Sequence, residues 1–96
     1  MKKNVTIKKG DYIELYKWRT ARKRCIECFG LYPIQNEIMG IVKGLWDYIT
    51  KPGITIRVKK VTDISVFCRI LVAYSDDFDI FIPKCVIKTV RTESNN

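Results

Sequence analysis

Histidine is absent from the 96 residues of this chain, and its absence removes several kinds of chemistry. A Ser–His or Cys–His nucleophile needs an imidazole base, so both mechanisms are excluded. The longest apolar runs, such as residues 70–73, are far too short to span a bilayer, and we expect no secretory signal at the start. Hydrophobic residues make up 47% and charged residues 29% of the chain, which is typical of one folded domain.

Cysteine is present four times, as Cys25, Cys28, Cys68 and Cys85. Four thiols suffice for two disulfides or one zinc ion, but nothing else indicates an oxidising compartment. Cys25 and Cys28 have the spacing of half a zinc site, whereas Cys68 and Cys85 are separated by 16 residues and lie in apolar runs. Free cysteines are often buried, so we expect the latter two in the core. We predict no cofactor and no metal, with Cys25 and Cys28 as the remaining zinc candidates.

Positive charge is concentrated at the start of the chain. The first 24 residues hold nine Lys and Arg against two acids, while the other 72 residues have a net charge of only +1. A nearly neutral domain with a cationic segment is typical of proteins that attach to nucleic acid or to an anionic membrane. The alternative is a solvated face that serves solubility.

The second half has strand patterns almost throughout. Residues 54–61 alternate apolar and polar side chains, and residues 66–74, 78–82 and 85–90 are rich in β-branched and aromatic residues. Short polar breaks between them predict an antiparallel meander. The acidic residues Asp76, Asp77 and Asp79 fit a turn better than a magnesium site, because no phosphate loop or base accompanies them. We therefore predict no enzymatic activity.

The first half permits two interpretations. Asp11 with Glu14 resembles a capping box and Gly30 a helix end, and residues 36–50 place apolar side chains on one helical face. Alternatively, residues 6–15 form a turn that leads into a strand, and residues 38–42 form a second strand in which glycine permits a bend. The pattern alone does not decide whether residues 36–50 are helix or strand.

Several short motifs resemble one family in their order. Residues 9–15 read KGDYIEL, which is similar to the opening of small SH3-like barrels of the translation machinery. Residues 34–35, 38–42, 53–61 and 73–75 resemble later pieces of the bacterial-type ribosomal large-subunit protein L-nineteen family, especially its divergent organellar members. The resemblance covers roughly residues 6 to 82. Departures occur at residues 45–52, which replace an Arg- and Gly-rich hairpin, and at Asp76, where the family has proline. Residues 17–33 form a longer connection, and residues 83–90 extend beyond the usual end.

The resemblance implies an SH3-like β-barrel with a structural role on large-subunit ribosomal RNA near the subunit interface. It also implies neighbouring ribosomal proteins as partners, no catalytic residues and no cofactor. We thus expect a mainly β domain over residues 1–90, with a long basic loop at 17–33 after the first strand, room for one short helix, and a flexible polar tail at 91–96.

Structured RNA is bound mainly through phosphates, 2′-hydroxyls and shape, so clustered cations are the candidate contacts. They are Lys8, Lys9, Lys17, Arg19, Arg22, Lys23, Arg24, Arg57, Lys59 and Lys60. Tyr16 and Trp18 are candidates for base stacking, with packing of Trp18 in the core as the alternative. Arg57 and Lys59 alternate with apolar residues, so they should share one face of a sheet.

The sequence therefore predicts a ribosomal RNA-binding protein, in a mitochondrial or other organellar ribosome first and in bacterial cytoplasm second. We expect no membrane and no small-molecule substrate among its partners. One alternative is a small phage or regulatory barrel that docks on a host protein through Trp46, Tyr48 and the apolar edge. Another is a free nucleic-acid-binding module of KOW type.

Overall fold

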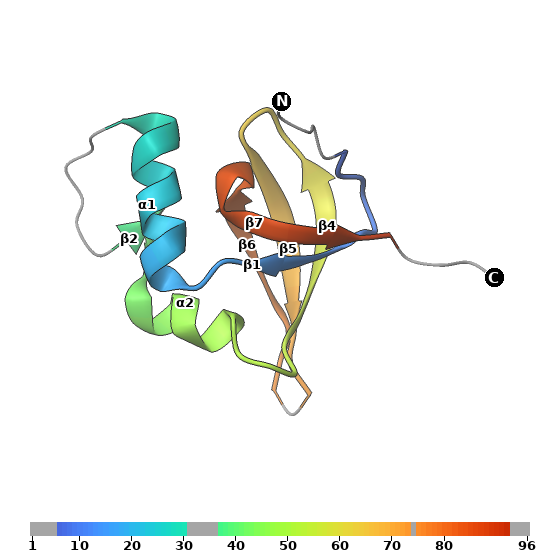
Figure 1. Ribbon diagram of the computed structural model, residues 1–96. Helices are drawn as coiled ribbons and strands as arrows, with labels where there is room; N and C mark the ends of the chain where they lie inside the picture. The colour runs from blue at the N-terminus through green and yellow to red at the C-terminus, as the bar shows by residue number, and fades with distance from the viewer. Residues whose placement is uncertain (1–5, 31–36, 74, 93–96) are drawn as a thin grey trace.

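Five antiparallel strands form the main sheet in the computed structural model, which describes residues 6–30, 37–73 and 75–92 (Figure 1). The elements in chain order are β1 (Tyr12–Leu15), α1 (Trp18–Phe29), β2 (Glu37–Ile38), β3 (Ile41–Val42), α2 (Lys43–Ile49), β4 (Thr55–Val61), β5 (Ser65–Leu71), β6 (Phe78–Pro83), the 3-10 helix η1 (Lys84–Val86) and β7 (Ile87–Arg91). The order across the sheet is β6-β5-β4-β1-β7. The last strand, β7, therefore lies beside the first strand, β1. On the other side of β1, the strands β4, β5 and β6 form a meander. This is the SH3-like order, so the predicted mainly β class is confirmed.

Alternation of side chains sets the two faces of the meander. Ile56 and Val58 of β4 are buried, whereas Arg57 between them is exposed. The register between β4 and β5 shifts between Val58 and Lys60, which leaves Lys59 as the extra residue of a bulge. The bulge bends β4 and increases its twist, as a small, curved sheet requires.

A tight turn leads into β1, as the strand interpretation of residues 6–15 predicts. The backbone N–H of Lys8 donates to the carboxylate of Asp11 at 2.9 Å, and the backbone N–H of Asp11 donates to the carbonyl of Lys8 at 3.0 Å. Gly10 has a φ of 94°, a conformation that side chains other than glycine rarely adopt. Asp11 is therefore a turn residue, and the prediction that it caps a helix is wrong.

The segment predicted as a basic loop at 17–33 is instead mostly the helix α1. Ala21 and Cys25 are buried, and Trp18, Arg22 and Ile26 are half-buried beside them. These positions recur at helical spacing, so one face of the helix packs against the rest of the protein. The helix ends at Gly30, whose N–H donates to the carbonyl of Ile26 at 2.8 Å. Residues 31–33 of the predicted loop lie outside the described residues.

Residues 37–49 combine the strand and helix interpretations. β2 and β3 form a two-stranded hairpin in which Met39 and Gly40 make the turn, with φ of 49° and 85°. Positive φ at both turn residues is what a two-residue hairpin loop requires. The helix α2 begins directly after β3, so apolar residues of both elements reach the core. The structure thus contains both helices of the helical interpretation in shorter form.

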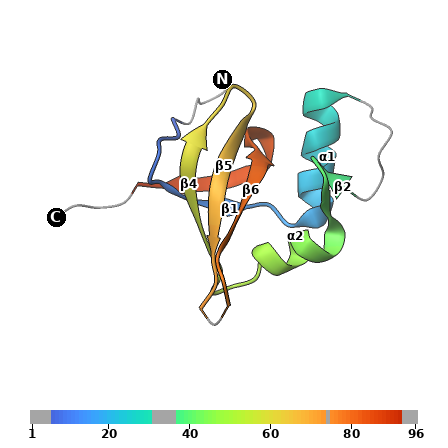
Figure 2. The same ribbon diagram turned by 180° about the vertical axis from the view of Figure 1, so that it is seen from behind.

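The insertion between β1 and β4 and the sheet share one hydrophobic core. Trp46 of α2 is fully buried, and its Nε1 donates to the carbonyl of Tyr16 at 3.0 Å. Both views show α1 beside the barrel, with α2 running from the foot of α1 toward the sheet (Figures 1 and 2). The insertion is therefore an integral part of the fold.

The predicted tail begins too early, because β7 extends to Arg91. Residues 93–96 of that tail, and the Ile-Gln step at 34–35, lie outside the described residues. Within the described ranges, no helix is long and apolar enough to cross a membrane.

Candidate nucleic-acid interface

Three arginines and a tyrosine occupy one row across the solvent-facing side of the sheet. The cross-strand register pairs Asp79 with Arg69, Arg69 with Arg57, Arg57 with Tyr12, and Tyr12 with Arg91. The row therefore crosses all five strands at right angles to the chain. We call this surface the outer face; its residues are Tyr12, Arg57, Lys59, Lys60, Phe67, Arg69, Asp79, Phe81 and Arg91. It holds five cations and one carboxylate.

Tyr12 lies between two of these guanidinium groups. The Cζ atom of Arg57 is 5.8 Å from the centroid of the Tyr12 ring, and that of Arg91 is 5.2 Å from it. Cation–π contacts of this length orient both arginines over the ring. The contacts hold planar, multidentate donors at fixed positions on a rigid sheet, which suits binding of phosphate oxygens.

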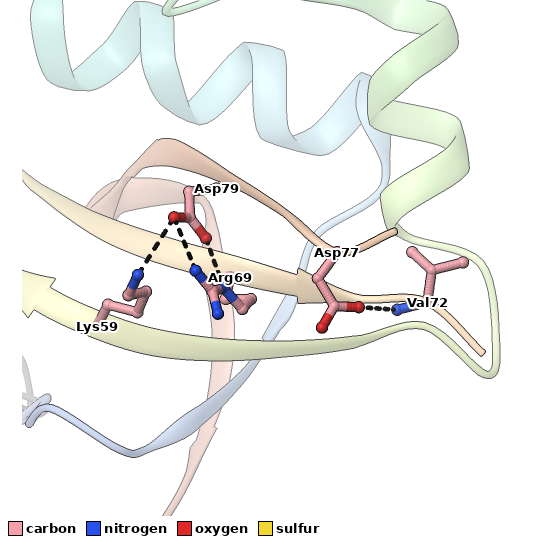
Figure 3. A network of polar contacts seen from close by, with 5 residues as sticks. All are labelled: Lys59, Arg69, Val72, Asp77 and Asp79. Carbon is pink, nitrogen blue, oxygen red and sulfur yellow. Dashed lines mark hydrogen bonds and ion pairs between the residues drawn. The ribbon is translucent and has the colours of Figure 1, made fainter. Parts of the chain in front are cut away.

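Asp79 holds the other end of the row (Figure 3). Its Oδ1 accepts from Nε of Arg69 at 2.9 Å, and its Oδ2 accepts from Nη2 of Arg69 at 3.3 Å and from Nζ of Lys59 at 3.2 Å. The hydrogen bonds from Arg69, followed by that from Lys59, lower the pKa of the Asp79 carboxyl. An anion that binds Arg69 must therefore compete with this carboxylate. Lys59 reaches the same side of the sheet as Arg57, as the alternation predicts.

One exposed and one half-buried aromatic ring, of Phe81 and Phe67, stand beside the cations. Phe67 and Phe81 are cross-strand partners whose ring centroids are 4.6 Å apart at an angle of 43°. Phe81 is 46% exposed, and Nζ of Lys59 lies 5.7 Å from the centroid of Phe67. Flat apolar rings at the surface of a basic sheet offer a stacking platform for unpaired bases.

The turn before β1 borders the outer face. A Cβ atom placed on Gly10 would lie 3.8 Å from Nη2 of Arg57, so the turn passes beside that side chain. Lys8 and Lys9 of this turn are exposed. The turn that carries these two of the ten predicted RNA contacts thus lies beside Arg57, a third one.

A groove continues from Tyr12 and Arg91 to where β1 and β4 diverge. It has a volume of about 670 Å³ and is lined by β1, the end of α2, the turn at Lys51–Gly53 and residues of β7. Its lining includes the cations Lys17, Lys51 and Lys88. The groove thus extends the positive surface along one side of the barrel.

Further cations lie on α1 and at Lys17, the residue before it. Nζ of Lys17 donates to the carbonyl of Thr50 at 3.1 Å, and Nε of Arg24 donates to the carbonyl of Cys85 at 2.8 Å. Both side chains therefore join the helix to the rest of the fold. Arg19 and Lys23 are exposed, whereas Nε of Arg22 is buried without a hydrogen-bond partner.

The two aromatic residues predicted to stack on bases have structural contacts instead. The guanidinium of Arg24 lies over the Tyr16 ring, with Cζ 4.7 Å from the centroid. Trp18 is half-buried and packs against the core, as the alternative interpretation states. Their predicted role in base stacking therefore has less support than that of Phe67 and Phe81.

The cysteines are not arranged as the zinc hypothesis requires. Cys68 lies within the barrel core, while Cys85 approaches Cys25 and not Cys68, with 3.9 Å between the sulfur atoms. Among residues 6–30, 37–73 and 75–92, no group of three or more Cys, Asp or Glu side chains has the geometry to hold a metal ion.

Five residues of the outer face were not among the contacts predicted from the sequence: Tyr12, Phe67, Arg69, Phe81 and Arg91. Each stands at an exposed or half-buried position of its strand, and Tyr12, Phe67 and Arg69 alternate with buried residues. The alternation along each strand could have identified these five as outward-facing residues. Only the register between strands brings them into one row.

In comparisons with family models, curated proteins and solved structures, nothing matches this chain. The resemblance to the L-nineteen family therefore stays a prediction.

Proposed function

We propose that this protein binds structured RNA through the outer face of its barrel, as a structural constituent of the large ribosomal subunit. The observation that carries the binding role is the row of Arg69, Arg57, Tyr12 and Arg91 across adjacent strands. Guanidinium groups contact phosphates without reading sequence, and the neighbouring phenylalanines stack on bases that RNA loops expose. Such a role requires fixed cations and no catalytic group, so the proposal is one of binding and not catalysis.

The ribosomal assignment is supported by the resemblance of residues 9–15 and 53–75 to the L-nineteen family. It names large-subunit ribosomal RNA and neighbouring ribosomal proteins as partners, most simply in a mitochondrial ribosome, with a bacterial one as second choice. The SH3-like strand order is compatible with this assignment. A free module of KOW type would use the same outer face.

The alternative of docking on a host protein through Trp46, Tyr48 and the apolar edge loses the first of these residues, whereas Tyr48 is half-buried. Trp46 is fully buried and hydrogen-bonded to the carbonyl of Tyr16. Its side chain contributes to folding and presents no surface to a partner.

Two double variants test the binding face with equal loss of charge. Arg57→Gln with Arg91→Gln removes two cations from the outer face, and Arg19→Gln with Lys23→Gln removes two from α1. Affinity for a large-subunit ribosomal RNA fragment is measured by fluorescence anisotropy over a range of salt. We expect roughly a tenfold or greater loss for the first pair and a salt slope reduced by about 1 to 2, because each phosphate contact releases nearly one counterion.

The matched pair should change the affinity by less than about threefold, because solvent screens exposed charges that do not touch the ligand. Equal losses for both pairs would mean that only total charge matters, and would refute the outer face as the binding site. Co-sedimentation with ribosomal particles at high salt then tests the assignment. A ribosomal protein stays with the large subunit, whereas a free KOW-type module washes off.

A further inference from the structure

Three of the four thiols meet where α1 contacts the end of the barrel. Cys25 and Cys28 lie on successive turns of α1, and Cys85 lies in η1, just before β7. The sulfur atoms of Cys25 and Cys85 are 3.9 Å apart, and Arg24 binds the carbonyl of Cys85 from the same helix. All three cysteines are reduced. The two elements are thus already held together with their thiols in contact.

The three thiols differ in exposure. Cys25 is 3% exposed, Cys85 is half-buried and Cys28 is exposed. A reagent in solution therefore meets Cys28 first, and a bond between Cys25 and Cys85 would be sheltered from reductants. Exposure thus decreases from Cys28 through Cys85 to Cys25.

Electrostatics favour the thiolate form of Cys25, the most buried of the three cysteines. The hydrogen bond from the Cys85 thiol is the largest effect and lowers the pKa of Cys25, to which the charge of Arg22 adds. The thiolate is the nucleophile in disulfide exchange, so Cys25 is suited to the final attack. The hydrogen bond to Cys25, followed by burial, raises the pKa of Cys85. Partial burial, followed by the neighbouring Cys85, also raises the pKa of Cys28, so its exposure and not its acidity makes it the first thiol that a reagent meets.

We propose that this cluster is a site of disulfide exchange, in which a low-molecular-weight disulfide oxidises Cys25 and Cys85 to a buried disulfide. The Cys28 thiolate attacks the small disulfide, forms a mixed disulfide with one half, and releases the other half as a thiolate. Cys85 then passes its proton along its hydrogen bond to the Cys25 thiolate, attacks the sulfur of Cys28, and releases the second half as a thiolate, which takes the proton from Cys25. Finally, Cys25 attacks Cys85 and returns Cys28 to its free form. Overall, two protein thiols are oxidised by two electrons and one small disulfide is reduced to two thiols.

The new bond would fasten α1 to the barrel. It would close a loop between residues 25 and 85, which removes conformational freedom mainly from the unfolded chain. We expect Tm to rise by roughly 10 °C on oxidation and to return on reduction. This inference rests on the thiol geometry alone and is independent of the proposed RNA binding.

The test uses the full chain in buffers of oxidised and reduced glutathione, followed by alkylation of the remaining free thiols. Trypsin with a glutamate-specific protease separates Cys25 in residues 25–27, Cys28 in residues 28–37 and Cys85 in residues 85–88. Mass spectrometry should find peptide 25–27 linked to peptide 85–88, with Cys28 alkylated. A final bond that contains Cys28, or no bond in oxidised glutathione, overturns the proposal.

The variant Cys28→Ser tests whether the exposed thiol of Cys28 reacts first. Its oxidation should be slower on the order of tenfold while the linked peptides stay the same, because only the exposed thiol is lost. The variant Cys85→Ser serves as the control and should show neither the link nor the rise in Tm. An unchanged rate in Cys28→Ser refutes the role of Cys28.

Discussion

Replacing Trp46 by phenylalanine tests whether the insertion between β1 and β4 belongs to the core. The side chain is fully buried, and its Nε1 donates to the carbonyl of Tyr16 at 3.0 Å. Phenylalanine is smaller and has no N–H group, so the variant leaves a cavity and a partly buried carbonyl without its partner. If the insertion did not pack on the barrel, neither loss would lower the stability.

The expected cost follows from these two losses. Shrinking a buried aromatic side chain costs about 1–2 kcal/mol, since full truncation to alanine costs about 3–5 kcal/mol. Because the Tyr16 carbonyl is only partly buried, leaving it without its partner costs about 1–2 kcal/mol more, in the lower part of the range for buried groups. We therefore expect Trp46→Phe to lower the free energy of unfolding by about 2–4 kcal/mol. A domain of this size has about 5–10 kcal/mol in total, so the variant still folds.

Far-UV circular dichroism in guanidinium chloride measures this loss without relying on the removed tryptophan. Trp18→Phe is the matched control, because Trp18 is the only other tryptophan and is only half-buried. It should cost about 1 kcal/mol or less. A loss below about 1 kcal/mol in Trp46→Phe, or an equal loss in both variants, would refute the integral insertion.

Two further predictions concern ionisable groups. The pKa of Asp79 is lowered by its hydrogen bonds from Arg69, so the ion pair persists below the usual carboxyl range and is lost as pH falls through the lowered pKa. A carbon-detected NMR titration should place that midpoint below 3.8, and Arg69→Gln should move it up; an unmoved midpoint would argue against the pair. Burial raises the pKa of the Cys68 thiol to about 12, so iodoacetamide at pH 8.5 should label Cys28 and leave Cys68 unlabelled until the protein is denatured. Labelling of Cys68 at the rate of Cys28 in the native protein would contradict its place in the core.

The C-terminal strands could be predicted because the alternation of side chains depends only on neighbouring residues. Residues 54–61 alternate in the period of a strand, and polar turn residues separate them from the next strand. The turn at Gly10 and Asp11 was also visible, since glycine permits its positive φ. Each of these features depends on a few neighbouring residues and needs no knowledge of the rest of the chain.

The helix α1 was one of two open interpretations, and residues 17–33 were finally predicted as a basic loop. Charges at residues 17–24 favoured an exposed loop, and the family resemblance favoured a barrel with at most one short helix. Ala21 and Cys25 nevertheless recur at helical spacing, and they are buried because α1 packs against η1, β2 and α2. The charge of a segment does not show how its apolar residues pack.

The candidate site was predicted only in part, because the register between strands is not written in local sequence. Arg57, Lys59 and Lys60 were expected, whereas Arg69 and Arg91 join them through pairings across β5, β4, β1 and β7. A shift of one residue in any pairing would turn these side chains to the core. The contact of Cys25 with Cys85 has the same origin, since it joins residues far apart in the chain.

The insertion is also hydrogen-bonded to the backbone next to two strands of the outer face. Trp46 binds the carbonyl of the residue that follows β1, and Arg24 binds the carbonyl of Cys85 ahead of β7. These are the two strands that carry Tyr12 and Arg91. The helices hold one end of each strand, at Tyr16 and at Cys85, so we expect the row of the proposed RNA-binding face to be in place in the free protein and binding not to order it. The insertion and the sheet then form one folded unit, and a change in the buried insertion should also be felt at the exposed face.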